Sequence, residues 1–167
     1  HEEALAIARR LGARAAELEA AGNWLFCLGE MGRDADVARI GLQILARDSE
    51  VFNAPLAANL AYSLLALGRL DEAEHWYRRV LASDNVSAAC AASGKLLEIA
   101  ARRGADAAGL DAAVAAVFAA IAATEMYGVQ AGALVAVLNH GRPEDIASAR
   151  ARLKDEPLYP GLQQRLD

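Results

Sequence analysis

The stretch ANLAYSLLALGRLDEAEHWYRRVLASD (residues 58–84) decides the fold, because a single glycine interrupts an otherwise continuous helical pattern. Apolar residues recur at spacings of three and four on both sides of this glycine, as they do along one face of an α-helix. The two stripes are Leu60, Ala61 and Leu64 before it, and Ala73, Tyr77, Val80 and Leu81 after it. At a helix end, glycine adopts the left-handed conformation that closes the last turn. We therefore expect Gly68 to be the turn between two antiparallel helices.

The same pattern occurs 36 residues earlier, in GNWLFCLGEMGRDADVARIGLQILARD (22–48). Further shifts of the chain extend the series of turn glycines to Gly32, Gly68, Gly104 and Gly141, at intervals of 36, 36 and 37 residues. A helical hairpin of this length can bury its apolar stripes only by stacking on its neighbours. The sequence therefore predicts an all-α fold of stacked antiparallel hairpins.

Composition supports this expectation and disfavours two classes of partner. Hydrophobic residues make up 55% of the 167 residues but aromatic residues only 5%, so helix-forming alanine and leucine dominate. The net charge is −5 with no basic block, which argues against a nucleic-acid partner or an anionic membrane surface. The most apolar run, AAVAAVFAAIAA (112–123), is too short to span a bilayer. We therefore expect neither nucleic-acid binding nor membrane insertion.

The residues that usually carry chemistry are scattered. His1, His75 and His140 lie in separate segments without the spacing of metal ligands, and no phosphate-binding or nucleophile motif occurs. Cys27 and Cys90 lie in helical patterns, and we expect two buried free thiols. These observations predict a protein without a catalytic site, a metal or a cofactor.

Residues 54–87 resemble the tetratricopeptide repeat, a helix-turn-helix unit of about 34 residues. Leu60 and Ala61 stand at its Leu-Gly pair, Gly68 at its turn, Ala73 at its small position and Tyr77 at its second-helix aromatic position. Three more repeats extend the resemblance, at residues 18–51, 90–123 and 127–158. A half repeat at 2–12 and a C-terminal capping helix at 158–167 complete a single domain, residues 1–167. Because the chain begins with His1, we expect it to be a fragment of a longer protein.

The resemblance implies a right-handed superhelix, a solenoid whose concave groove is lined mainly by the first helix of each repeat. The family's groove positions, carried over, are Asn23, Phe26 and Glu30 in the first repeat, Asn59, Tyr62 and Leu65 in the second, and Lys95 and Glu98 in the third. Small residues along the same face, such as Gly22, Gly29, Gly94 and Gly132, would let another backbone approach closely.

The two aromatics, Phe26 and Tyr62, are candidate anchors for a partner, although packing on a neighbouring helix is an equally natural role. Asn23 and Asn59 would bind an extended peptide backbone or, alternatively, a helix end. Some family members hold a terminal carboxylate with a clamp that includes an asparagine. That position carries Phe26, Tyr62 and Glu98 here, so we do not expect the clamp.

The sequence thus predicts a scaffold or adaptor that binds a peptide or a helix of another protein, with the cytoplasm as the favoured compartment. The alternative is an accessory helical-repeat domain of a larger enzyme, such as a glycosyltransferase, or of a regulator. The parent gene beyond both ends would separate these two readings. An open half repeat at 2–12 would also allow self-association.

Overall fold

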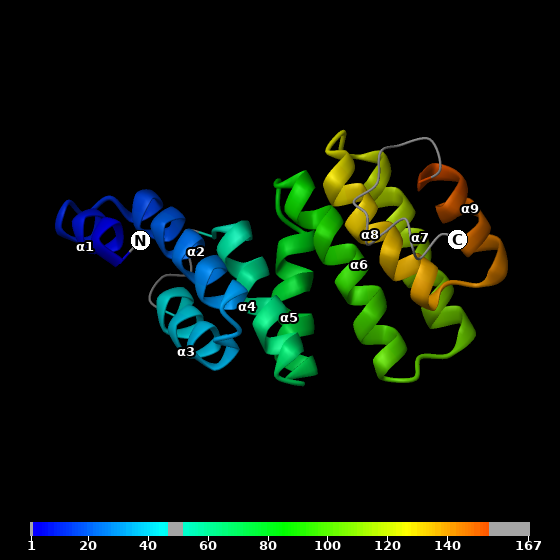
Figure 1. Ribbon diagram of the computed structural model, residues 1–167, viewed down its shortest axis with the longest axis horizontal. Coiled ribbons are helices and arrows are strands. Elements are labelled where there is room, and N and C mark those ends of the chain that lie inside the picture. Colours follow the sequence, from blue (N-terminus) through cyan, green and yellow to red (C-terminus); the bar gives the residue numbers. More distant parts are fainter. Residues whose placement is uncertain (1, 47–51, 154–167) are drawn as a thin grey trace.

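The computed structural model describes residues 2–46 and 52–153, and within these ranges it contains nine α-helices and no strand (Figure 1). The helices are α1 (Glu2–Arg10), α2 (Arg14–Glu30), α3 (Asp34–Leu45), α4 (Ala54–Ala66), α5 (Leu70–Leu81), α6 (Val86–Arg102), α7 (Ala107–Ala122), α8 (Tyr127–His140) and α9 (Pro143–Leu153). The predicted all-α class is confirmed. The predicted cap at 158–167 and the ends of the repeats 18–51 and 127–158 lie outside the described residues.

Each helix packs mainly on its neighbours in the chain or on the helix two places further along. Helices α2 and α3, α4 and α5, α6 and α7, and α8 and α9 form consecutive contacting pairs, and α1 packs on α2. The first members of these pairs also contact one another in the row α2–α4–α6–α8. The helices therefore follow one another along the long axis of the molecule, with α1 at one end and α9 at the other (Figure 1).

Three of the four predicted glycine turns have the expected left-handed geometry. Gly32, Gly68 and Gly104 have φ angles of +70°, +75° and +68°, and Gly12, at the end of α1, has +64°. At Gly68 the backbone N–H of Arg69 donates to Leu64 O at 2.9 Å, and the N–H of Gly68 donates to Leu65 O at 3.1 Å. This pair of bonds is the Schellman motif, which satisfies the last carbonyls of α4.

The expectation of a left-handed turn at Gly141 is wrong. Gly141 has φ −74° and ψ 166°, an extended conformation. The next helix begins only two residues later, at Pro143, so the extended Gly141 leads the chain almost directly from α8 into α9. The glycine is needed here for space instead, because a Cβ would lie 2.7 Å from Val137 O.

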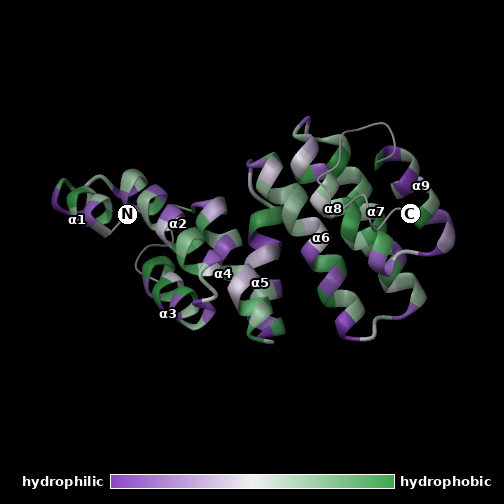
Figure 2. Cartoon of the chain, viewed as in Figure 1, coloured by the Kyte–Doolittle hydropathy of each residue, from purple (hydrophilic) through white to green (hydrophobic). Residues whose placement is uncertain are grey.

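Two apolar clusters form the core, and α6 joins them. The predicted stripes of residues 58–84 are buried between α4 and α5, except for the half-buried Leu81. Ala92 and Ile99 of α6 belong to this first cluster, whereas Cys90 and Leu97 belong to a second cluster with α7, α8 and α9. Figure 2 shows that α7, whose sequence is AAGLDAAVAAVFAAIA, consists mostly of hydrophobic residues. Both cysteines are free, and Cys90 is buried as predicted while Cys27 is only half-buried.

Small residues allow a close approach of α6 and α8. A Cβ on Gly94 of α6 would lie 3.0 Å from the Cα of Ala133 on α8, so a larger residue would require the two helices to move apart. Near the N-terminus, Gly41 stands where the resembled family has an aromatic. The side chains of Leu25 and Leu60 occupy that space, since a Cβ on Gly41 would lie 3.1–3.2 Å from their methyl groups.

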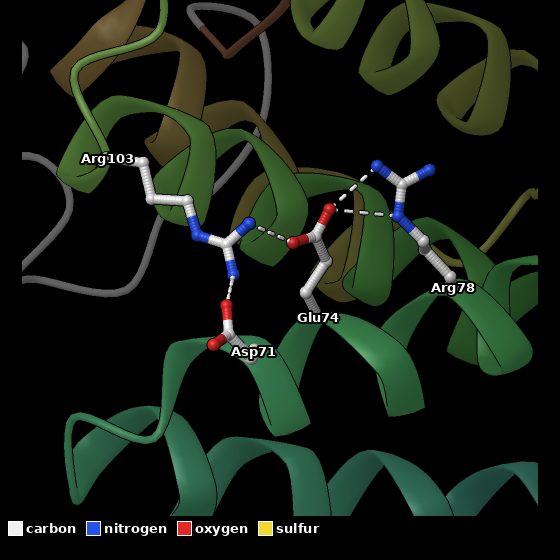
Figure 3. A network of polar contacts seen from close by, with 4 residues as sticks. All are labelled: Asp71, Glu74, Arg78 and Arg103. Carbon is white, nitrogen blue, oxygen red and sulfur yellow. Dashed lines mark hydrogen bonds and ion pairs between the residues drawn. The ribbon is translucent and has the colours of Figure 1, made fainter.

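One ion-pair network connects α5 to the turn that follows α6. Arg103, which follows α6, contacts Asp71 and Glu74 of α5, and Glu74 also accepts a hydrogen bond from Arg78 at 2.7 Å (Figure 3). This network holds the turn between α6 and α7 against α5.

The second network lies at the N-terminal end. The buried Glu17 of α2 accepts hydrogen bonds from Arg9 of α1 and from Arg14, both at 2.7 Å. Arg14 donates in turn to Ile44 O of α3 at 3.1 Å. Burial opposes ionisation of Glu17, but the two guanidinium groups outweigh it and hold the pKa of Glu17 below its usual value. These contacts join α1, α2 and α3.

At this end, Ile7 of α1 and Leu11, which follows α1, are 41% and 75% exposed. The predicted self-association through residues 2–12 stays a prediction.

Replacement of glycine by alanine should have opposite effects on stability at Gly68, in the left-handed turn, and at Gly132, inside α8. We expect Gly68→Ala to lower the free energy of unfolding by about 1–2 kcal/mol, because the added Cβ is strained at positive φ. Gly132→Ala, inside α8 where a Cβ would meet nothing within 4 Å, should raise it by about 0.5–1 kcal/mol. Urea unfolding followed by circular dichroism measures both. A stabilising Gly68→Ala would contradict the turn geometry.

The Glu17 network predicts a pH-dependent contribution to stability. Because the pKa of Glu17 is lower in the folded state than the ordinary 4.5, the ionised carboxylate stabilises the fold above that pH. The contribution is lost as the pH falls through the folded-state pKa. We expect Glu17→Gln to lower the free energy of unfolding by about 1–3 kcal/mol at pH 7, and to have little effect in strong acid. The exposed Glu19→Gln is the control, and equal effects of the two variants at pH 7 would contradict the assignment.

Candidate partner-binding groove

A groove of about 550 Å³ runs across the first helices of the consecutive pairs, and we call it the inner groove. All but one of its lining residues come from α2, α4, α6 and α8, and the exception is Tyr77 of α5. The lining is Leu25, Phe26, Gly29, Glu30, Ala58, Asn59, Tyr62, Ser63, Tyr77, Ala91, Lys95, Gly128, Val129, Gly132 and Val135. The groove is therefore built by segments more than 100 residues apart in the sequence, because the first helices contact one another in a row.

Two aromatic side chains are presented to solvent in this groove. Phe26 of α2 and Tyr62 of α4 are 55% and 54% exposed, although both are large. Leu25 and Ala61, next to them in the sequence, are fully buried, so each helix turns its aromatic away from the core. Exposed apolar surface gathered in a hollow is typical of a surface that binds a partner.

The α6 wall carries a chain of paired charges. The Lys95 ammonium lies 5.2 Å from the ring centre of Tyr62 and 3.0 Å from the Glu98 carboxylate. Arg102 contacts the same carboxylate at 2.5 Å. Burial opposes ionisation of Glu98, but the bonds and charges of Lys95 and Arg102 prevail and keep its pKa below the usual range. A smaller pocket of about 240 Å³, which Glu98 and Asn139 help to line, continues the groove past Lys95.

The structure brings five of the eight predicted site residues into the inner groove and Glu98 into its continuation. The five are Phe26, Glu30, Asn59, Tyr62 and Lys95. Asn23 is exposed but lies outside the lining. Leu65 is only 3% exposed and belongs to the core, since α4 is contacted by α2, α3, α5 and α6 and has few open faces.

Asn59 has a structural bond within the groove. Its Nδ2 donates to the backbone oxygen of Gly22 at 3.0 Å, which ties α4 to α2. Of the other small residues predicted on this face, Gly29 and Gly132 line the groove. Gly22 and Gly94 are buried instead, against Leu56 and Ala133.

Sequence reasoning missed the floor of the groove and part of the α8 wall. Tyr77 was assigned to the core by its position in the stripe of α5, and it is indeed buried, but it also lines the groove. On α8, Gly128 and Val129 line the groove beside Gly132, which the sequence predicted on this face. The spacing of Gly128 and Gly132, four apart on one helix face, was the signal that could have set the register.

Other kinds of site have little support in the described part of the chain. Within residues 2–46 and 52–153, no group of three or more His, Cys, Asp or Glu side chains is placed to hold a metal ion. No helix in these ranges is long and apolar enough to cross a membrane.

Comparison with known proteins gives no match: no family model, no curated protein and no solved structure is significantly similar to the chain. The function must therefore be argued from the groove.

The exposure of the two aromatics predicts that they contribute little to folding. We expect Phe26→Ala and Tyr62→Ala each to change the free energy of unfolding by less than about 1 kcal/mol. Leu60→Ala, at a fully buried position of the same helix as Tyr62, should cost about 2–5 kcal/mol. Thermal and urea unfolding compare the three variants. A loss at Phe26 or Tyr62 as large as that at Leu60 would show that the aromatics are part of the core.

Proposed function

We propose that the chain is a tetratricopeptide-like α-solenoid that acts as a non-catalytic adaptor and binds a helix or peptide of another protein. The observation that carries the proposal is the inner groove, in which Phe26 and Tyr62 stand exposed on adjacent helices. Partner-binding surfaces are enriched in such aromatics, since they provide large contact area with few rotatable bonds.

The proposed architecture is a right-handed superhelix of stacked hairpins. Three turns with the same left-handed glycine, at intervals of 36 residues, and the row of contacts α2–α4–α6–α8 support this arrangement. A stacked array of this kind has an extended groove whose backbone is held by helix packing. A partner would therefore bind to a largely preformed surface, which reduces the entropy lost on binding.

We expect most of the binding free energy to come from the two aromatic anchors, Phe26 and Tyr62. Truncation of a well-packed aromatic anchor typically costs about 2 kcal/mol or more, which corresponds to about 30-fold in affinity. The charge-paired α6 wall, Lys95 with Glu98 and Arg102, would lie at the rim and contribute mainly to orientation.

The proposal predicts a partner whose binding depends on the two aromatics. With the chain as bait in cell extracts, we expect the native protein to retain a specific protein that Phe26→Ala/Tyr62→Ala loses, at unchanged helical circular dichroism. The control is Leu67→Ala/Val86→Ala, which removes two apolar side chains that are 43% and 48% exposed outside the groove. Purified partner and titration calorimetry then give the affinity. Equal binding by both double variants would place the site elsewhere on the molecule.

A further inference from the structure

Tyr77 carries a hydroxyl group that nothing in the described protein binds. The residue is only 2% exposed and packs in the core next to Ala73 and Val80, yet it lines the inner groove. The structure gives its hydroxyl no hydrogen bond within residues 2–46 and 52–153. The hydroxyl is not enclosed by protein atoms but open to the groove, where water can reach it. An occupant that displaces this water must replace its hydrogen bond. A ligand in the groove is in position to supply one.

This hydroxyl is a donor at neutral pH. Burial, with smaller contributions from the negative charge of Glu98 and from Tyr62, raises the pKa of Tyr77 far above its ordinary value. The phenol therefore keeps its proton. A matching occupant presents a hydrogen-bond acceptor, and a neutral one, because Lys95, the cation of the lining, is already paired with Glu98 and a buried carboxylate without a partner is costly.

Glu30 supplies the second recognition element. It is the last residue of α2, it lies exposed in the groove lining, and it makes no ion pair with any described residue. Lys95 and Glu98, by contrast, are paired with each other. The carbonyl end of a helix also carries negative partial charge, which adds to the field of the carboxylate. This end of the groove therefore favours a cation.

The walls on both sides of the groove leave room for a backbone. A Cβ on Gly128 or Gly132 of α8 would meet nothing within 4 Å, and one on Gly29 of α2 would meet only the Ser63 hydroxyl, at 3.9 Å. A helix can come close to such walls and insert the side chains of one face between Phe26 and Tyr62. A groove of about 550 Å³ holds a few apolar side chains of one helix face rather than a whole helix.

We infer that the inner groove takes an amphipathic helix of a partner protein, with one neutral acceptor in its apolar stripe for Tyr77 and one Lys or Arg beside the stripe for Glu30. The inference rests on the proposed function, since it names the partner chemistry of the same groove. The acceptor is an Asn, Gln, Ser or Thr side chain, because the backbone carbonyls inside a helix already have partners. A site built around a buried donor rejects ligands that lack the acceptor.

The test is selection from a displayed library of a helical peptide with one face fully randomised. We expect the native chain to enrich peptides with an apolar stripe, one Asn, Gln, Ser or Thr within it, and Lys or Arg at one flank. The Tyr77→Phe variant should still select peptides with the apolar stripe and the basic flank, but without a preference for the acceptor. It should bind the peptides selected by the native chain about tenfold more weakly. Glu30→Lys should change the flank preference to Asp or Glu, while Glu19→Lys, a control on the same helix outside the groove lining, should not.

Different outcomes distinguish the inference from the proposed function. Equal selection by Phe26→Ala/Tyr62→Ala would overturn the proposed function itself, whereas selection of nothing from the helical library would overturn the inference of a helical occupant. If the native chain selects apolar peptides that carry neither an acceptor nor a basic residue, and Tyr77→Phe and Glu30→Lys do not change the selection, only the inference is overturned. If Tyr77→Phe is unstable, replacing the acceptor of a selected peptide with alanine tests the same bond on the native chain, and unchanged affinity overturns it. A central proline in the peptide should abolish binding, and retained binding would rule out a helix.

Discussion

In the described part of the chain, the apolar residues of a helix pair are buried by neighbouring helices as well as by each other, and the rest of the structure depends on that packing. The α4–α5 pair illustrates it: Leu60, Leu64 and Val80 are fully buried, but only because α2, α3 and α6 cover the pair from both sides. Stability therefore comes largely from contacts between helices that are adjacent in the chain or two places apart. Packing fixes the position of each helix pair relative to the next. The positions of the groove residues follow from this packing.

The groove is a consequence of the same stacking. Aligning α2, α4, α6 and α8 in a row brings Phe26, Tyr62, Lys95 and Val135 to one surface. Their neighbours in the sequence, such as Leu25 and Ala61, face the core. One helix thus stabilises the fold with one face and lines the inner groove with the other. Tyr77 contributes to both, because it packs in the core and also lines the groove.

Electrostatics adds orientation to a mostly apolar surface. The α6 wall is internally paired, since Glu98 holds both Lys95 and Arg102. Glu30 on the opposite side has no such partner among the described residues. The groove is therefore asymmetric in charge, although the helices that build it repeat one pattern, and an asymmetric groove can distinguish the two directions of a bound segment.

The sequence by itself determined the helices, the turns and much of the groove. Spacings of three and four located the buried stripes of α4 and α5, and the glycine series located the turns at Gly32, Gly68 and Gly104, because positive φ strains any other residue. Five of the eight predicted site residues line the inner groove. The tertiary structure alone decided the rest. Leu65 is buried because four helices surround α4. Gly94 of α6 is buried against Ala133 of α8 and does not line the inner groove. Tyr77 reaches the groove floor from a second helix. These outcomes depend on contacts between segments distant in the chain, and a local periodicity carries no information about them.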